Sequence, residues 1–277
     1  MQVNEKAYAK INLFLDVTER RQDGFHNIVS VMQSVSLCDT ILLNASCSDT
    51  TLIRITSDDP GLPLDENNLI YKAAEKYLSY YGICAEVDIH LTKQIPIGAG
   101  LGGGSSDAAA TLRALDKVFN LSSENELLRL SAEIGSDVPF CLIGGRALCT
   151  GRGEQLEALK EYPINHFVIS IGKEKVSTPK AYRALDEKYG NFGGSTYTPV
   201  QYSGQLYNIF ESITDINEVD IIKEIMTKNG AESTLMSGSG PSVFGIFMNS
   251  DDAKKAAEIL RSSGFSAFEC HSVRENL

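Results

Sequence analysis

The sequence has no long hydrophobic run and no excess of positive charge. No segment approaches the roughly 20 apolar residues of a membrane-spanning helix, and the start, MQVNEKAYAK, lacks the apolar core of a secretory signal. Lys and Arg number 25 against 36 Asp and Glu, which gives a formal net charge of -11 over 277 residues. Such a surface repels nucleic acids and anionic membranes, so we expect neither as a partner. An anionic small molecule stays possible where its positive contacts are local.

Paired cysteines and metal-ligand spacings are also lacking. The six cysteines contain no C-x-x-C pair, which in a chain of this length is typical of reduced, mostly buried thiols in a cytoplasmic protein. Neither the cysteines nor three of the four histidines have the spacing of metal ligands, so we predict no resident metal site. The residues left without a role are Cys38, Cys47, Cys84, Cys141, Cys149, Cys270, His90, His166 and His271.

The hydrophobic pattern predicts an α+β protein without internal repeats. Period-two alternation predicts strands and 3.6-residue periodicity predicts helices. The expected strands are 7–17, 28–37, 40–46, 51–57, 86–91, 166–171, 233–248 and 266–273. The expected helices are 68–82, 105–119, 122–135, 178–190, 206–213, 218–230 and 251–264. A polar stretch near residues 151–163 predicts the division of the chain into domains 1–157 and 158–277.

A glycine-rich segment, "IPIGAGLGGGSSDAAA" at 95–110, joins a predicted strand to a predicted helix. Ser105 and Ser106 occupy the position of a helix N-cap. A helix N-terminus presents unpaired N–H groups and partial positive charge, and glycines let a ligand approach the backbone closely. The segment therefore favours a phosphate-binding loop. The alternative is a glycine-rich turn packed tightly on a neighbour.

Three known phosphate loops do not match this segment. A Walker A loop needs a lysine after its last glycine, but Gly104 is followed by Ser105. Gly98, Gly100 and Gly103 fit the dinucleotide pattern G-x-G-x-x-G, yet the following helix leads to another helix and not to a second strand. The protein-kinase loop is excluded because no H-R-D or D-F-G triplet follows.

The segment "PIGAGLGGGSSDAA" resembles the phosphate loop of the GHMP kinases. "AYAKINLFLDV" resembles their N-terminal motif and "LMSGSGPSVFGIF" their C-terminal glycine loop, so three motifs stand in the family's order. "AKINLFLDVTERRQDGFHNI" and "GSDVPF" further resemble the branch of the family whose substrate is an alcohol linked to cytidine diphosphate. The resemblance covers nearly the whole chain.

This resemblance implies a two-domain GHMP kinase fold with an active site between the domains. The N-terminal domain would bind ATP and be of the ribosomal protein S5 domain 2-like type, with a left-handed β-α-β unit near the phosphate loop. The C-terminal domain would bind the substrate and be a ferredoxin-like α/β sandwich. The implied reaction is transfer of a phosphoryl group from ATP to the 2-hydroxyl group of the cytidine diphosphate compound.

Two residues match the family's catalytic pair. Asp137 in "GSDVPF" is then the general base, and Lys10 in "AKIN" approaches it, keeps it ionised and orients the acceptor hydroxyl. The residue pattern alone leaves other interpretations open. Asp137 also suits a cap or turn before a proline, and Lys10 suits an edge-strand lysine that reaches water.

The resemblance also implies a set of substrate contacts. Asn12 lies on the same strand face as Lys10 and would contact the substrate; the alternative is a strand-end hydrogen bond. Phe25, where the family usually has tyrosine, and Tyr182 would stack on the cytosine ring, with His26 at its edge. From the pattern alone, a turn or surface role for His26 and a core position for Tyr182 stay open.

Two glycine loops complete the expected site. The hydroxyl groups of Ser105 and Ser106 would ligate Mg²⁺ or phosphate oxygens, with N-capping as the alternative. The "SGSGP" turn would pack beside the phosphate loop and contact substrate phosphates, unless it is only a turn between strands. The expected ATP contacts are Pro96, Ile97, Gly98, Ala99, Gly100, Leu101, Gly102, Gly103, Gly104, Ser105 and Ser106, and the expected substrate contacts in the turn are Ser237, Gly238, Ser239 and Gly240.

Several points stay open at this stage. Asp107 would repel nearby phosphates unless a metal intervened, and the only metal expected is Mg²⁺ arriving with ATP. A kinase for another small alcohol, such as homoserine, would not need an aromatic clamp for a base. A non-catalytic sugar or nucleotide sensor would not need both Lys10 and Asp137. Monomer and homodimer both remain open, as does closure of the segment 190–204 over a substrate.

Overall fold

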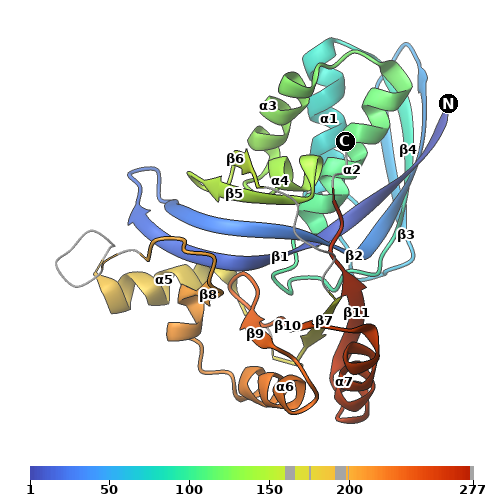
Figure 1. The fold of residues 1–277 in the computed structure, drawn as a ribbon. Coiled ribbons are helices and arrows are strands. Elements are labelled where there is room, and N and C mark those ends of the chain that lie inside the picture. The colour runs from blue at the N-terminus through green and yellow to red at the C-terminus, as the bar shows by residue number, and fades with distance from the viewer. Residues whose placement is uncertain (160–165, 175, 191–197, 199, 275–277) are drawn as a thin grey trace.

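Two β-sheets organise the chain (Figure 1). The computed structural model describes residues 1–159, 166–174, 176–190, 198 and 200–274. The larger sheet has seven strands in the order β3-β4-β2-β1-β8, with β5 pairing to β2 and β6 pairing to β5. The smaller sheet has four strands in the order β11-β7-β10-β9. Part of the predicted segment 190–204 lies outside the described residues.

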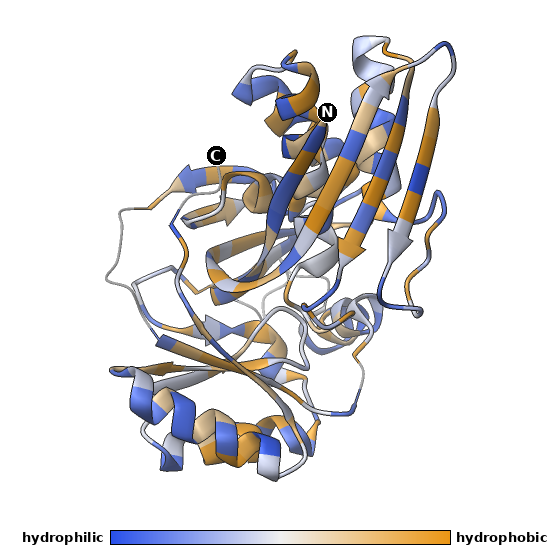
Figure 2. Cartoon of the chain, turned by 90° about the vertical axis from the view of Figure 1, so that its right-hand side faces the viewer, coloured by the Kyte–Doolittle hydropathy of each residue, from blue (hydrophilic) through white to orange (hydrophobic). Residues whose placement is uncertain are grey.

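The larger sheet is built on two long antiparallel strands, β1 and β2. The first half of β2 pairs with β5 on its outer side and the second half pairs with β4, so the sheet divides along this strand. Figure 2 shows the alternating hydrophobic and hydrophilic bands along the strands, which place one face of each on the core. The strands are β1 (Gln2–Arg20), β2 (His26–Cys47), β3 (Leu52–Ser57), β4 (Ala85–Thr92), β5 (Arg146–Thr150), β6 (Gln155–Ala158) and β8 (Tyr207–Asn208).

The predicted break between strands 28–37 and 40–46 is wrong, because β2 includes both. The pairing register with β1 shifts between Tyr8 and Lys10, which bends the long strand instead of ending it. Asp39, a typical turn residue, is fully buried in β2. Its carboxylate accepts hydrogen bonds from the backbone N–H groups of Gln94 (2.5 Å) and Ile95 (2.7 Å). These bonds take the place of the hydrogen bonds to water that the carboxylate would make in an exposed turn.

Four helices pack on the larger sheet and share one hydrophobic cluster with it. The predicted first helix is confirmed, with Asn68 as its N-cap and Gly82 closing it at a φ of 63°. The predicted third helix begins with a capping box between Ser123 and Glu126. The helices are α1 (Leu69–Tyr81), α2 (Gly103–Phe119), α3 (Glu124–Ile134) and α4 (Val138–Ile143). In the described part of the chain, none of the helices is both long and apolar enough to cross a bilayer.

The smaller sheet has the predicted ferredoxin-like arrangement. Its strands are all antiparallel, and the order β11-β7-β10-β9 is that of a βαββαβ unit whose fourth and third strands flank the first. The strands are β7 (His166–Ile171), β9 (Ser233–Met236), β10 (Val243–Phe247) and β11 (Ser266–His271). The helices are α5 (Thr178–Tyr189), α6 (Asn217–Lys228) and α7 (Ser250–Ser262).

The predicted helix 206–213 is wrong. Its residues form the short strand β8, which pairs with β1 of the larger sheet, followed by the 3-10 helix η1 (Ile209–Ser212). The Asn208 side chain explains the change, because its amide donates to the carbonyl oxygens of Met236 (2.7 Å) and Gly238 (2.8 Å) while its oxygen accepts from the Phe210 N–H (3.0 Å). A continuous helix would break these bonds.

We propose that the division at residue 157 separates the two sheets except for β8 and for Ala158, the last residue of β6. The left hand of the β-α-β unit also stays a prediction, although β3, α1 and β4 do form such a unit with adjacent parallel strands. The expectation of mostly buried cysteines holds for Cys141, Cys149 and Cys270, whereas Cys47 and Cys84 are exposed.

Replacing Asn208 by alanine should destabilise the protein. The change leaves two buried carbonyl groups and one N–H group without partners, which we expect to lower the free energy of unfolding by about 2–3 kcal/mol. Urea unfolding followed by far-ultraviolet circular dichroism measures it, since the chain has no tryptophan. The exposed Asn44→Ala serves as control and should stay within about 0.5 kcal/mol of wild type. Equal unfolding midpoints for the two variants would contradict the assigned role of Asn208.

Candidate active site

A cavity of about 600 Å³ lies where β1, the glycine loop, α5 and the β9–β10 turn meet. This size suits a small organic ligand. The predicted residues that line it are Lys10, Asn12, Phe25, His26, Gly100, Gly102, Ser105, Asp137, Tyr182, Gly238 and Ser239. Those that do not line it are Pro96, Ile97, Gly98, Ala99, Leu101, Gly103, Gly104, Ser106, Ser237 and Gly240.

Lys10 and Asp137 meet at one end of the cavity. The Lys10 Nζ lies 3.4 Å from Oδ2 of Asp137, and only 6% of the lysine side chain is exposed, against 30% for the aspartate. Asp137 stands at the N-cap position of α4, but its carboxylate makes no capping hydrogen bond. The carboxylate is therefore available to a ligand in the cavity.

Hydrogen bonds fix the Lys10 ammonium in this position. It donates to Oδ1 of Asn12 (2.8 Å), whose amide donates to Ser30 Oγ (2.8 Å). The Ser30 hydroxyl in turn donates to the carbonyl oxygen of Phe14 (2.7 Å). Since all of these groups are buried, the chain holds the ammonium group at a defined distance from Asp137.

The glycine loop packs against β1 and against the β9–β10 turn. The Lys10 N–H donates to the carbonyl oxygen of Leu101 (3.0 Å), and a Cβ on Gly102 would lie 3.0 Å from the lysine side chain. At Gly100, with a φ of 79°, a Cβ would lie 2.6 Å from the carbonyl oxygen of Ser237. Only glycine fits there, and the predicted packing of the "SGSGP" turn beside the loop is confirmed.

The β9–β10 turn is tied to the site by its two serines. The buried Ser237 hydroxyl accepts from the Asn12 N–H (3.2 Å) and donates to the Gly100 carbonyl (3.3 Å). Ser239 Oγ lies 3.0 Å from Oγ1 of Thr178, at the start of α5. The turn therefore joins the glycine loop, β1 and α5.

The predicted N-cap at Ser105 or Ser106 is wrong, because α2 begins at Gly103 with Gly102 as its N-cap. Ser106 is buried, and its hydroxyl donates to the carbonyl oxygen of Tyr8 (2.6 Å) and lies 3.3 Å from Sγ of Cys141. Ser105 lines the cavity. The left-handed backbone that Gly102 provides moves the helix start earlier than the hydroxyl pattern indicates.

Helix α2 also connects β1 to α4 through Arg113, which lies seven residues after Ser106 on the same helix face. The buried guanidinium donates to the Lys6 carbonyl (2.7 Å) on β1 and to the Cys141 carbonyl (3.1 Å) at the end of α4. Arg113 thus links β1, which carries Lys10, to α4, which follows Asp137.

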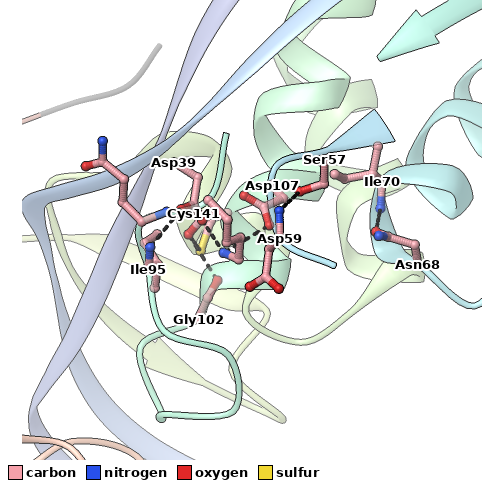
Figure 3. Close-up of polar contacts among 12 residues, drawn as sticks. Asp39, Ser57, Asp59, Asn68, Ile70, Ile95, Gly102, Asp107 and Cys141 are labelled. Carbon is pink, nitrogen blue, oxygen red and sulfur yellow. Dashed lines mark hydrogen bonds and ion pairs between the residues drawn. The ribbon is translucent and has the colours of Figure 1, made fainter. Parts of the chain in front are cut away.

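Asp107 does not line the cavity and belongs to a buried charge cluster with Asp39 and Lys93. Figure 3 shows Asp39 and Asp107 of this cluster. Lys93 forms ion pairs with Asp39 and, at 3.3 Å, with Oδ2 of Asp107. Burial raises the pKa of Asp107 well above its usual range, the Asp39 carboxylate adds to the rise, and Lys93 opposes it. Because Asp107 contacts Lys93 and does not line the cavity, its carboxyl group is not placed to contact an anion bound there.

Aromatic rings and a histidine form the other end of the cavity. The His26 ring stacks on Tyr182 with ring centroids 4.8 Å apart, and Tyr182 meets the edge of Phe210 at 4.9 Å. His26 Nε2 lies 2.8 Å from Oδ1 of Asp186, which also pairs with Arg20 at 3.3 Å.

Sequence reasoning missed several lining residues at this end. Asp186 follows Tyr182 by four residues on α5, and this helical spacing was the available signal for it. Phe25 is 53% exposed and has the guanidinium of Arg152 5.2 Å from its ring centroid. Over the whole cavity, the missed residues are Leu15, Arg20, Gly24, Ile28, Met32, Ser136, Arg152, Thr178, Pro179, Arg183, Asp186 and Phe210.

Known proteins are similar to this chain over most of its length. The GHMP kinases N terminal domain matches residues 68–145, and the GHMP kinases C terminal domain matches residues 216–266. A 4-diphosphocytidyl-2-C-methyl-D-erythritol kinase of Caldicellulosiruptor saccharolyticus is 43% identical over 269 residues, covering 92% of each chain. The chain belongs to the family of 4-diphosphocytidyl-2-C-methyl-D-erythritol kinases, among the GHMP kinases. The kinase of this family from Bacillus subtilis is 41% identical over 277 residues, covering 94% of this chain and 93% of the relative.

Solved structures agree with membership of the 4-diphosphocytidyl-2-C-methyl-D-erythritol kinase family. A crystal structure of 4-(cytidine 5'-diphospho)-2C-methyl-D-erythritol kinase has a TM-score of 0.82 at 32% identity and covers 98% of this chain and 99% of that one. The homoserine kinase from Cytophaga hutchinsonii has a TM-score of 0.65 at 25% identity, covering 96% and 95%. The predicted GHMP kinase fold is confirmed.

Replacing Asp107 by asparagine should change how stability depends on pH. The folded wild type keeps the Asp107 proton above the unfolded pKa of about 3.9, so this carboxyl costs the wild type stability as pH rises toward its folded pKa. The asparagine side chain of the variant has no such proton to lose. The free energy of unfolding of Asp107→Asn, minus that of wild type, should therefore be larger at pH 8 than at pH 5.

Urea unfolding at the two pH values tests this prediction. The control is Asp88→Asn, because the hydrogen bond from Arg54 lowers the pKa of the exposed Asp88, whose titration is then complete below pH 5. Its difference from wild type should be the same at both pH values. An equally constant difference for Asp107→Asn would mean that Asp107 is already charged in the folded chain.

Proposed function

We propose that this chain transfers the terminal phosphoryl group of ATP to the 2-hydroxyl group of 4-(cytidine 5'-diphospho)-2-C-methyl-D-erythritol. This step belongs to the non-mevalonate route to isoprenoid precursors, and we place it in the cytoplasm. One observation carries the proposal: the Lys10–Asp137 pair lies in the same cavity as a glycine loop and an aromatic-histidine pocket. The Lys10–Asp137 pair suits proton transfer, the glycine loop suits phosphate groups, and the aromatic-histidine pocket suits a nucleobase.

In this proposal the glycine loop holds the triphosphate of ATP through residues 96–106. The start of α2 supplies backbone N–H groups and partial positive charge, which an acidic protein otherwise lacks. Gly100, Gly102 and Ser105, which line the cavity, are the proposed direct contacts. Ser106 does not contact the phosphates in this proposal, because its hydroxyl already donates to the Tyr8 carbonyl oxygen and so ties the start of α2 to β1.

Mg²⁺ would arrive with ATP and be held mainly by phosphate oxygens, with the Ser105 hydroxyl as the nearest candidate ligand of the chain. This fits the donor set, because the described residues contain no group of three or more His, Cys, Asp or Glu side chains that could hold a metal alone. Bound there, Mg²⁺ neutralises charge on the phosphates.

Asp137 is the proposed general base and Lys10 its partner. The partly exposed carboxylate can accept the proton of the substrate hydroxyl as that hydroxyl attacks the terminal phosphorus of ATP. The Lys10 ammonium, 3.4 Å from the carboxylate, lies close enough to orient the hydroxyl. Asn12 fixes the ammonium and lines the cavity beside it, where it would also contact the substrate.

Cytosine recognition is proposed for the other end of the cavity. Phe25 presents an exposed ring, and Tyr182 lies on the opposite element α5, so the two can stack on a flat base. His26 would bind the base edge, held by Asp186. Gly238 and Ser239 line the cavity and would contact substrate phosphates, with Ser237 and Gly240 shaping their turn.

A coupled assay of ADP release with a panel of alcohols tests the function. The cytidine diphosphate substrate should be phosphorylated, whereas mevalonate and homoserine should be inert because they lack a base for the aromatic pocket. Turnover of homoserine or mevalonate together with none of the cytidyl compound would reject the proposed substrate. No turnover of any alcohol, with CDP still bound, would favour a nucleotide sensor.

Removing either member of the Lys10–Asp137 pair should abolish most turnover. Asp137→Asn keeps the shape but cannot accept the proton, so kcat should fall by about 10²- to 10⁴-fold with little change in the KM for ATP. Lys10→Ala should lose turnover in the same assay with an unchanged circular dichroism spectrum. Lys6→Ala, an exposed lysine on the same strand, is the matched control and should stay near wild type. Near-normal turnover of Lys10→Ala would remove the lysine from the mechanism.

A further inference from the structure

A Gly-Arg-Gly loop, Gly151–Gly153, lies between the two ends of the cavity. The Gly151 carbonyl accepts from the N–H of Ile28 (2.7 Å), two residues after His26. At the other side of the loop, a Cβ on Gly153 would lie 3.7 Å from Oδ1 of Asp137. The backbone of this short loop therefore spans from the pocket of rings to the carboxylate, and Arg152 stands at its centre.

The Arg152 side chain lies in the part of the cavity between the pocket of rings and Asp137. It lines the cavity with 30% of the side chain exposed, and its guanidinium lies 5.2 Å from the ring centroid of Phe25. Glu154 holds the loop by accepting from the Arg152 N–H (2.7 Å), while its ion pair with the guanidinium is long, at 4.0 Å. A guanidinium carries five N–H donors, so most of its capacity stays available to a ligand in the cavity.

The two other arginines of the cavity are placed differently. Arg20 pairs with Asp186, which also contacts His26, so the Arg20 guanidinium helps to hold the wall of the pocket. Arg183 is exposed on α5, and within the described residues no contact ties it to Phe25 or Asp137. Of the three arginines, only Arg152 lies over the Phe25 ring while its own loop, at Gly153, lies close to Asp137.

The order of groups in the proposed substrate matches this placement. A diphosphate joins the cytidine to the hydroxyl-bearing part, so a substrate with its base at Phe25 and its hydroxyl at Asp137 must place the diphosphate between them. A planar guanidinium binds phosphate oxygens in pairs. In a protein of net charge -11, a diphosphate also needs a local cation.

We propose that Arg152, from its position over the Phe25 ring, binds the diphosphate group of the substrate. This inference rests on the proposed function. The guanidinium covers one face of the Phe25 ring, which leaves the other face for the base. Arg152 is thus a specificity-determining residue that favours a nucleoside diphosphate over a nucleoside.

Competition experiments with cytidine, CMP and CDP against the cytidyl substrate test the inference. In Arg152→Gln the inhibition constant of CDP should rise by about 10- to 100-fold, as expected for loss of a charge-assisted contact. The constant of cytidine should change by less than about 2-fold, and the KM for ATP should not change. Arg152→Lys should recover part of the CDP affinity, because lysine keeps the charge without the planar fork.

Arg183→Gln is the matched control, since it removes one positive charge from the same cavity. An equal loss of CDP affinity in both variants would show general charge attraction and overturn the specific contact of Arg152. An equal loss for cytidine and CDP in Arg152→Gln would assign Arg152 to support of Phe25 alone and also overturn it. A wild type that binds CDP through Arg152 but phosphorylates only other alcohols would reject the proposed function and leave this site standing.

Discussion

The burial of one ammonium group constrains the whole site. A buried charge is costly unless it is paired and hydrogen-bonded, so Lys10 needs both Asn12 and Asp137. The same short segment of β1 donates to Leu101 of the glycine loop and to Ser237 of the β9–β10 turn. Correct placement of a single strand therefore positions the glycine loop, the turn from the other sheet and the carboxylate together. Elements far apart in the sequence are thus positioned by contacts with the same short segment of β1.

Local sequence signals account for most of the elements but not for their connections. The caps at Asn68 and Ser123 act within a few residues of where they occur, so the helix boundaries follow directly from the pattern. The residue pattern predicted a break at Asp39 because it gave no sign of the groups that stabilise its buried carboxylate. Those groups come from the segment 93–95, more than fifty residues away. The same limit applies to Asn208, whose partners lie on β9 and its turn. Long-range polar contacts override local preference and leave no periodic trace.

The candidate site shows the same division. The motifs around Lys10 and Asp137 are local, and their resemblance to a known family was enough to pair them. Arg152 and Asp186 lie in segments that look like an ordinary loop and an ordinary amphipathic helix, and only the fold turns them toward the cavity. The position of Asp107 was also beyond sequence reasoning, because the side chain sits in the first turns of the helix yet points to Lys93 and not to the loop. In this acidic chain, the carboxyl group nearest the start of α2 is thus turned toward a buried lysine and away from the glycine loop.

The two-residue strand β8 has a consequence for how such a chain can be divided or recombined. Tyr207 and Asn208 belong by sequence to the second part, yet they cover the outer edge of β1 in the first part's sheet. A fragment ending near residue 157 would expose that edge, and open strand edges favour aggregation. Exchange of one half with a relative would succeed only if the donor supplied this covering strand as well. The two sheets therefore do not form independent modules.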